Sequence, residues 1–175
     1  MNRWYILYSS DNMALDAGIR LSNLGMRTFC PTEYRATTIG EDKIWEQFPS
    51  RPDLLFVYGT YDDIRSLITL HGMKSLEFLS TPSSGSITTP VTVNDYDMEN
   101  LMRLVNVGMP QSYSVTEKEI HYRPGGLVRV TGGPFKDIVG RVARIHTQTR
   151  VVVSIPGVIS YATTYIPKHQ MELVI

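Results

Sequence analysis

The chain has 175 residues, of which 42% are apolar and 19% charged, and this length allows one ordinary domain or two small ones. Its N-terminal apolar run, residues 4–8, is far shorter than the roughly 20 residues of a membrane helix and lacks the parts of a secretion signal, so we expect a cytoplasmic protein without a membrane anchor. Cys30 is the only cysteine, which excludes an internal disulfide or a paired-cysteine metal site.

The zero net charge hides an asymmetry between the two parts of the chain. Residues 1–120 hold ten Lys+Arg against fifteen Asp+Glu, whereas residues 121–175 hold seven against two. Opposite charges of this kind predict two units with different partners. Because phosphate binding needs a surplus of Lys and Arg, we do not expect a dominant non-specific nucleic-acid footprint on the first part, whereas the second could contact RNA or DNA.

The first half of the chain alternates between predicted strands and helices. Residues 3–9 are rich in aromatic and β-branched side chains and predict a strand. Ser10 or Asp11 is expected to cap the helix that follows, and Gly25 to close it. Its apolar stripe is Ala14, Ala17, Leu21 and Leu24.

Further along, extended residues 26–39 and 43–48 flank a predicted turn at 40–42. Residues 53–60 are the strongest strand signal, and Asp62 or Asp63 is expected to cap a helix that ends near Leu70. Residues 75–79 predict a short strand and residues 80–90 a loop. A third helix opens with Asn94 and Asp95 as capping candidates.

These elements predict a mixed α/β unit over residues 1–106 and a connector without periodicity over residues 107–123. From residue 124 to residue 175 the pattern is all β, with roughly five short strands separated by turns. Strands at that spacing indicate a small closed barrel.

The run GGLVRVTGGPFKDIVGRV, residues 125–142, predicts a corner of this barrel. Valines at alternating positions point inward, glycines turn and bend the chain, proline fixes its own φ, and phenylalanine closes one end. The positions expected to build the corner are Val128, Val130, Gly132, Gly133, Pro134, Phe135, Gly140 and Val142.

Residues 128–142 also resemble the KOW motif, and VSIPG followed by MELV resembles the end of the NusG C-terminal domain. RWYILYS, FCPTEYR and PDLLFVYGTYDDI resemble the first strand, the second strand and the central strand with its helix in the NusG N-terminal (NGN) domain. ITTPVTVNDYDMENLMRL is similar to the last helix of that domain. The chain thus resembles the NusG family of transcription elongation and antitermination factors. This implies an α+β fold, with an NGN domain (1–106), a linker (107–123) and an SH3-like KOW barrel (124–175).

The resemblance implies that the NGN domain binds the coiled coil of the RNA polymerase clamp through an apolar patch and promotes processivity. The matching positions here are Trp4, Tyr8, Pro52, Leu54 and Phe56, and the alternative is that these residues are core. Leu54 stands where the family usually has an aromatic residue, which makes Phe48 and Pro49 reserve candidates.

The resemblance also implies further partners. The family's KOW domain reaches Rho or a ribosomal protein through an aromatic residue after Ser-Ile, and Pro156 here favours a specialised, operon-specific paralog. Segments around residues 36–43 and 60–66 approach non-template DNA in relatives, which makes Arg35 and Lys43 candidate contacts. The alternative for residues 36–43 is a plain solvated hairpin.

An RNA-binding or ribosome-associated KOW protein is the rival interpretation. Its contact surface would be the basic residues of the second half, for which the alternative is the polar outer face of a barrel. These residues are Arg129, Lys136, Arg141, Arg144 and Arg150.

No pattern in the sequence indicates catalysis. The four histidines are scattered without ligand spacing, Asp95 and Asp97 suit a helix start, and no phosphate-binding loop or nucleophile elbow is present. We therefore expect no enzymatic activity, cofactor or metal, and the family resemblance implies a monomer.

Overall fold

The structure, a computed structural model, describes residues 1–82, 87–107 and 112–174. Within these residues the chain is mixed α/β with mostly antiparallel strand pairs, which agrees with the predicted fold class. Contacts divide it into unit 1, Met1–Thr32 with Arg51–Met98, and unit 2, Glu33–Ser50 with Glu99–Ile175.

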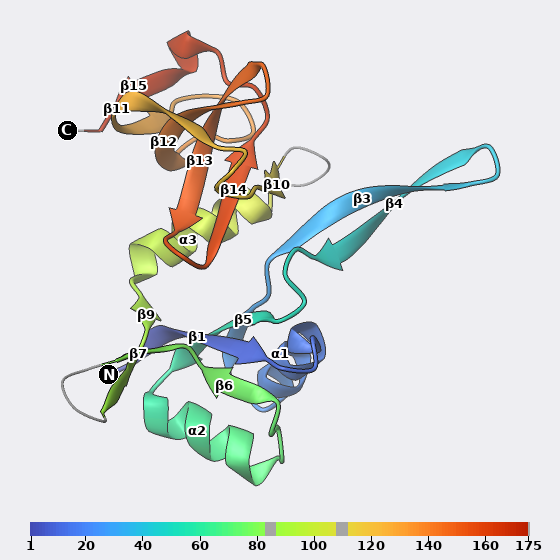
Figure 1. Ribbon diagram of the computed structural model, residues 1–175, viewed down its shortest axis with the longest axis vertical. Coiled ribbons are helices and arrows are strands. Elements are labelled where there is room, and N and C mark those ends of the chain that lie inside the picture. The colour runs from blue at the N-terminus through green and yellow to red at the C-terminus, as the bar shows by residue number, and fades with distance from the viewer. Residues whose placement is uncertain (83–86, 108–111, 175) are drawn as a thin grey trace. The chain divides into compact units, whose positions relative to one another are not determined.

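Unit 1 is built on an antiparallel sheet in the order β2-β5-β1-β6, with β9 also paired to β1 (Figure 1). The strands are β1 (Arg3–Ser9), β2 (Arg27–Phe29), β5 (Leu54–Gly59), β6 (Leu76–Phe78) and β9 (Thr92–Val93). The strands predicted at residues 3–9, 53–60 and 75–79 are confirmed. Part of the predicted loop forms a hairpin, β7 (Ser80–Pro82) with β8 (Thr88–Pro90), and its residues 83–86 lie outside the described residues.

Two helices, α1 (Ala14–Asn23) and α2 (Tyr61–Leu70), pack on one face of this sheet. Strand residues of alternating positions supply one side of the core, because successive side chains of a strand point to opposite faces. The buried cluster consists of Leu7, Ala14, Ala17, Leu21, Leu55, Val57, Ile64, Met73 and Leu76. Leu24, predicted for the apolar stripe of α1, instead lies at the end of the helix and is 40% exposed.

The helix starts follow local hydrogen bonding. Thr60 caps α2, since its Oγ1 accepts a hydrogen bond from the Asp63 N–H (3.1 Å) and donates one to Asp63 Oδ2 (2.7 Å). The prediction of Asp62 or Asp63 as the cap is therefore wrong, although Asp63 takes part in the reciprocal contact. At α3 (Asp95–Val105), Asn94 Oδ1 accepts from the Asp97 N–H (2.8 Å), which confirms Asn94.

The start of α1 differs from its prediction. The helix begins at Ala14, and Met13 occupies the capping position without a side-chain hydrogen bond. Asp11 accepts from the Met13 N–H (3.1 Å), ahead of the helix. Its pKa is lowered, chiefly by the hydrogen bond that it accepts from Ser9. Gly25 closes the helix at φ 89°, as predicted.

Unit 2 contains a six-stranded antiparallel sheet in the order β10-β14-β13-β12-β11-β15 (Figure 1). The strands are β10 (Ser112–Ser114), β11 (His121–Val130), β12 (Val139–Ile145), β13 (Gln148–Ile155), β14 (Ile159–Thr163) and β15 (Met171–Leu173). The five strands predicted after residue 124 correspond to the last five, and a 3-10 turn, Lys168–Gln170, precedes β15.

Residues 112–123, expected to be connector, instead belong to this sheet. Ser112–Ser114 pairs with β14, and β11 already begins at His121. Between them, Val115 and Ile120 cover the sheet face that carries Ala143, Ile145, Val152 and Ala162. Of the expected connector, residues 108–111 lie outside the described residues.

A two-stranded ribbon completes unit 2, with β3 (Thr32–Ile39) and β4 (Asp42–Pro49) joined at Gly40, whose φ is 65°. The contact division therefore differs from the expected boundaries: residues 33–50 and 99–106 group with the C-terminal sheet rather than with the N-terminal residues. The expected turn at residues 40–42 is present at Gly40-Glu41.

The predicted corner of residues 125–142 is largely present. Val128, Val130 and Phe135 are buried, and Gly133 turns the chain at φ 74°, while Pro134 is exposed. Val142 is half-buried, paired with the buried Val151.

Gly140 lies inside β12, not at a bend between strands. A Cβ there would stand 2.8 Å from Val151 Cγ1 and would collide with the Val152 carbonyl oxygen. The close approach of β13 therefore explains this glycine.

Among the described residues, no helix combines the length and the apolar character that crossing a membrane requires.

Candidate functional site

The residues predicted for polymerase binding converge on one face of the unit 1 sheet. β1 and β5 are antiparallel neighbours, with Tyr8 opposite Leu54 and Ile6 opposite Phe56. Directly paired residues share a face, and alternate residues along a strand do too, so Trp4 lies on the same face. This face is opposite the one that carries Leu7, Leu55 and Val57 under the helices. We call Trp4, Tyr8, Leu54 and Phe56 the β1–β5 face.

Exposure divides the predicted patch. Trp4, Leu54 and Phe56 are buried, at 1%, 0% and 0%, which agrees with the core alternative for these three. Tyr8 is half-buried, and Pro52, in the turn before β5, is exposed. Of the five residues of the predicted patch, Tyr8 and Pro52 are therefore the two that a partner can reach. The reserve candidates Phe48 and Pro49 lie on β4 of unit 2, where Phe48 is 37% exposed.

Tyr8 is accompanied by an ion pair that the sequence reading missed. The Arg51 guanidinium lies 5.2 Å from the centroid of the Tyr8 ring. It also donates to both carboxylate oxygens of Asp53, at 2.6 and 3.1 Å. Burial disfavours the charged form of Arg51, but the hydrogen bond and charge of Asp53 outweigh it, and the pKa of Arg51 is raised. Tyr8, Arg51, Pro52 and Asp53 form the Tyr8 edge.

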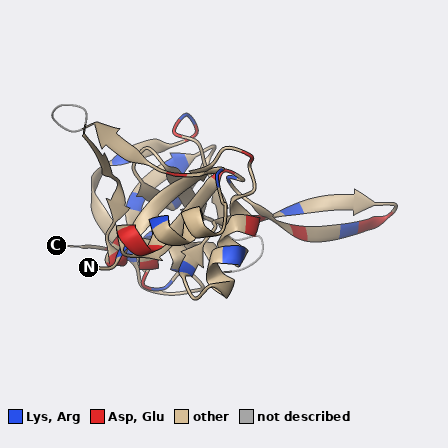
Figure 2. Ribbon diagram, turned by 90° about the horizontal axis from the view of Figure 1, so that it is seen from below, with Lys and Arg blue, Asp and Glu red and all other residues tan. Residues whose placement is uncertain are grey.

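The two candidate DNA contacts on the ribbon already have neighbours within the chain. Arg35 donates to Glu33 Oε1 from two nitrogens (3.0 and 2.9 Å) and lies 5.6 Å from the Phe48 ring. Lys43 lies 5.0 Å from the Trp45 ring. The ribbon carries charges of both signs (Figure 2), so it offers phosphate no uniform basic surface.

The basic residues of the six-stranded sheet have different roles. Arg150 is half-buried and donates to the Thr163 carbonyl (2.8 Å) and to Gln148 Oε1 (2.8 Å), which is a structural role. It also lies over Tyr113, whose pKa is raised by burial, with Arg150 opposing part of the rise. Arg141 and Arg144 are exposed, and the Arg141 guanidinium lies 4.3 Å from the centroid of the Tyr122 ring.

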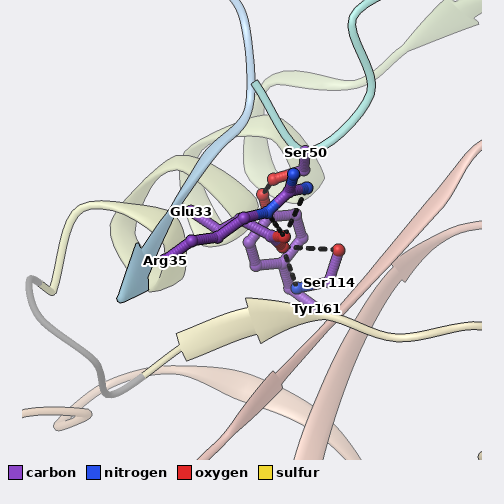
Figure 3. Close-up of polar contacts among 5 residues, drawn as sticks. All are labelled: Glu33, Arg35, Ser50, Ser114 and Tyr161. Carbon is purple, nitrogen blue, oxygen red and sulfur yellow. Dashed lines mark hydrogen bonds and ion pairs between the residues drawn. The ribbon is translucent and has the colours of Figure 1, made fainter. Parts of the chain in front are cut away.

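A polar cluster in unit 2 attaches the root of the ribbon to the six-stranded sheet (Figure 3). Glu33 Oε2 accepts from the backbone N–H of Ser114 (3.2 Å) and from its hydroxyl (2.6 Å). At the other end of the ribbon, the Ser50 hydroxyl is hydrogen-bonded to the buried Tyr161 hydroxyl. Hydrogen bonds to the six-stranded sheet therefore hold the ribbon at both of its ends in the sequence, the start of β3 and the residue after β4.

Sequence reasoning missed these groups for different reasons. Arg51 and Asp53 flank Pro52 in a turn that the Leu54 N–H closes on the Arg51 carbonyl (3.1 Å), where strand alternation does not apply, so the local signal was limited to two opposite charges two positions apart. Glu33–Ser114 and Ser50–Tyr161 join residues 81 and 111 positions apart, and no local pattern identifies such pairs.

Among the described residues, no group of three or more His, Cys, Asp or Glu side chains has the arrangement of a metal site. No protein-family model matches the chain, and no curated protein matches it significantly.

Proposed function

We propose that this protein is a NusG-type transcription elongation factor that binds RNA polymerase through unit 1 and favours processive or antiterminated transcription. On this proposal it works in the bacterial cytoplasm by contact alone, without catalysis, cofactor or metal. Unit 1 would correspond to the core of an NGN domain and the six-stranded sheet to an SH3-like KOW domain.

The observation that carries the proposal is the convergence on the β1–β5 face. The resemblance selects residues from two segments almost fifty positions apart, and these segments are adjacent antiparallel strands with the selected side chains on one face. Alternation puts the selected residues of each strand on one face of that strand, and the register of β1 and β5 makes this the same face for both, opposite the helices. The turn at Gly133 (φ 74°), within the run that resembles the KOW motif, adds support.

We place the polymerase contact at the Tyr8 edge, because it is the part of the predicted patch that a partner reaches. Tyr and Arg dominate small interfaces when both are held by neighbours. Here Asp53 fixes Arg51, and Arg51 lies against the Tyr8 ring. The buried Leu54 and Phe56 would support this edge from below rather than touch the polymerase.

The six-stranded sheet would recruit a second partner. Pro156 follows Ile155 at the position where the family places its aromatic anchor, so Rho and the ribosomal protein are disfavoured and an operon-specific role is favoured. Contacts of Arg35 and Lys43 with non-template DNA remain part of the proposal, although both side chains would have to leave Glu33 and Trp45.

The test is binding of the full chain to bacterial core RNA polymerase, measured with Tyr8→Ala and with Tyr96→Ala as the matched control. Tyr96 is 58% exposed on α3, so its truncation removes an equal side chain from elsewhere in unit 1. We expect Tyr8→Ala to weaken binding at least tenfold, the range of an interface hot spot, and Tyr96→Ala to leave it unchanged.

Circular dichroism and the unfolding temperature establish that both variants are folded. Failure of the unmodified chain to bind core polymerase contradicts the proposal outright. Equal loss in both variants contradicts the placement at the Tyr8 edge.

A further inference from the structure

Strands β11 and β12 carry arginines that make no ion pair with the described acidic side chains. The two strands contain Arg123, Arg129, Arg141 and Arg144 and no Asp or Glu. Ion pairs among the described residues are Arg35–Glu33 and Arg51–Asp53, so none of these four arginines forms one, and Arg129 alone has an acidic register partner, Glu172.

Strand register places two of these arginines and two large side chains on one face. Arg141 pairs with Leu127 across β11 and β12, and Arg129 follows Leu127 by two positions. Tyr122 pairs with Ala143, which lies two positions from Arg141 on β12. The Tyr122 ring is therefore on the same face as Arg141. We call Tyr122, Leu127, Arg129 and Arg141 the β11–β12 platform.

The platform is open to solvent. Tyr122 is 40% and Leu127 46% exposed, and both arginines are exposed. The adjacent sheet residues of the same face, Ala143 and Val152, are buried under Val115 and Ile120. The segment that covers the rest of this face therefore stops short of the platform.

Tyr122 and Arg141 form a layered pair. The guanidinium lies 4.3 Å from the ring centroid, the shortest such distance among the cation–ring pairs of the described residues. The tyrosine hydroxyl is hydrogen-bonded to Ser154 Oγ (3.3 Å), which in turn contacts Ser160 Oγ (2.7 Å). The ring is thus held in orientation, and Arg141, which lies over it, is an exposed residue.

Beside the platform, the register of β11 shifts between Tyr122 and Leu127. Gly125 (φ 137°) and Gly126 lie in this stretch, and a Cβ at either would meet nothing within 4 Å. Gly125 and Gly126 carry no side chains, so the backbone of a ligand can approach the strand beside Arg123.

We propose that the β11–β12 platform binds a single-stranded nucleic acid. A base stacks on the Arg141 plane above Tyr122, and the neighbouring phosphates are neutralised by Arg123 and Arg129. Unstacked bases of a single strand stack on arginine planes and aromatic rings, whereas the base faces of a duplex are covered by neighbouring base pairs. Glu172, in register with Arg129 on β15, bounds the site on one edge. This proposal goes beyond polymerase binding and does not depend on it.

The experiment measures fluorescence anisotropy of a labelled single strand of about 12 nucleotides, within the usual range of site sizes, titrated with the full chain. RNA and DNA strands of the same mixed sequence form two arms, and the corresponding duplexes form two more. We expect saturable binding of one or both single strands, weakened by salt, and at least tenfold weaker binding of the duplexes. The two single-strand arms decide between RNA and DNA as the source.

Three variants test the layered pair. Tyr122→Ala and Arg141→Ala should each weaken binding about tenfold, the effect of losing one stacked base. Tyr122→Phe keeps the ring and should retain most of the affinity. Arg3→Ala removes an exposed arginine of unit 1 and should change nothing.

Unfolding temperatures establish that the variants are folded. No binding by the unmodified chain overturns the proposal, as does equal binding of duplex. So does unchanged affinity of Tyr122→Ala, or a loss in Arg3→Ala as large as in Arg141→Ala, since either means charge attraction without a stacking site.

Discussion

Asn100 pairs with the backbone of Val139 as a neighbouring strand would. Its side-chain amide nitrogen donates to the Val139 carbonyl, and its Oδ1 accepts from the Val139 N–H (2.9 Å). Asn100 is 8% exposed and Val139 5%, so both backbone groups depend on this one side chain. The contact ties the C-terminal part of α3 to the first residue of β12 within unit 2.

We expect Asn100→Ala to lower the free energy of unfolding by about 2–4 kcal/mol, because it leaves a buried donor and a buried acceptor unsatisfied. Asn100→Asp keeps the acceptor but sets a buried carboxylate oxygen against the Val139 carbonyl, and should cost at least as much. Urea denaturation of the full chain measures both. Asn106→Ala, exposed after the same helix, is the control, and an equal loss there would contradict the assigned role.

Two glycines of unit 2 should respond oppositely to alanine. At Gly140 a Cβ collides with Val152 of the neighbouring strand, whereas at Gly126 it meets open space. We expect Gly140→Ala to destabilise by about 1–3 kcal/mol, as overpacking does, and Gly126→Ala to be neutral or slightly stabilising. Thermal unfolding compares them, and similar effects at both positions would refute the close-approach explanation.

Glu33 should contribute more to stability than other acidic residues of the ribbon. Glu33→Ala removes the acceptor of two Ser114 donors, and hydrogen bonds to a charged group are each worth about 1.5–3 kcal/mol. Glu46→Ala, whose contact with Thr37 is long (3.4 Å) and exposed, is the matched control. Hydrogen exchange at the Ser114 amide measures the local effect directly, and unchanged exchange in Glu33→Ala would exclude the anchor.

Cys30 should be a slow thiol. Burial raises its pKa to about 11, and its thiol donates to the Leu54 carbonyl at 3.5 Å. The thiolate is the reactive form, so we expect alkylation at pH 8 to be far slower in the native chain than in urea. Since ionisation is disfavoured in the folded state, this thiol's contribution to stability is present below pH 9 and declines as the pH rises toward 11. Fast native alkylation at pH 8 would show that the thiol is accessible.

Local patterns predicted the elements whose signals are local. β1 matches its predicted bounds, because its aromatic and β-branched residues form one continuous run that ends at polar residues. Thr60 was missed as a cap because aspartates such as Asp62 and Asp63 are also good caps. The hydrogen bonds exchanged between Thr60 and Asp63 determine that the helix is capped by Thr60.

Features that depend on contacts between residues distant in sequence could not be predicted. Residues 112–120 show no periodicity because the side chains that pack on the sheet, Tyr113, Val115 and Ile120, are unevenly spaced, and their partners lie on other strands. The faces of β1 and β5 could be deduced from alternation, but the burial of Trp4, Leu54 and Phe56 depends on what packs there. The polar anchors of the ribbon depend on pairs more than eighty residues apart.

The ribbon is synthesised before the residues that anchor it. Residues 33–50 interrupt unit 1 in the sequence, and their partners Ser114 and Tyr161 lie 81 and 111 positions after Glu33 and Ser50. At about 5–20 residues per second, the ribbon waits roughly 4–20 seconds on the ribosome before its supports exist. During that interval the two strands, which have open edges and carry the exposed Ile39 and Ile44, are not yet held by these anchors and are free to pair with other chains.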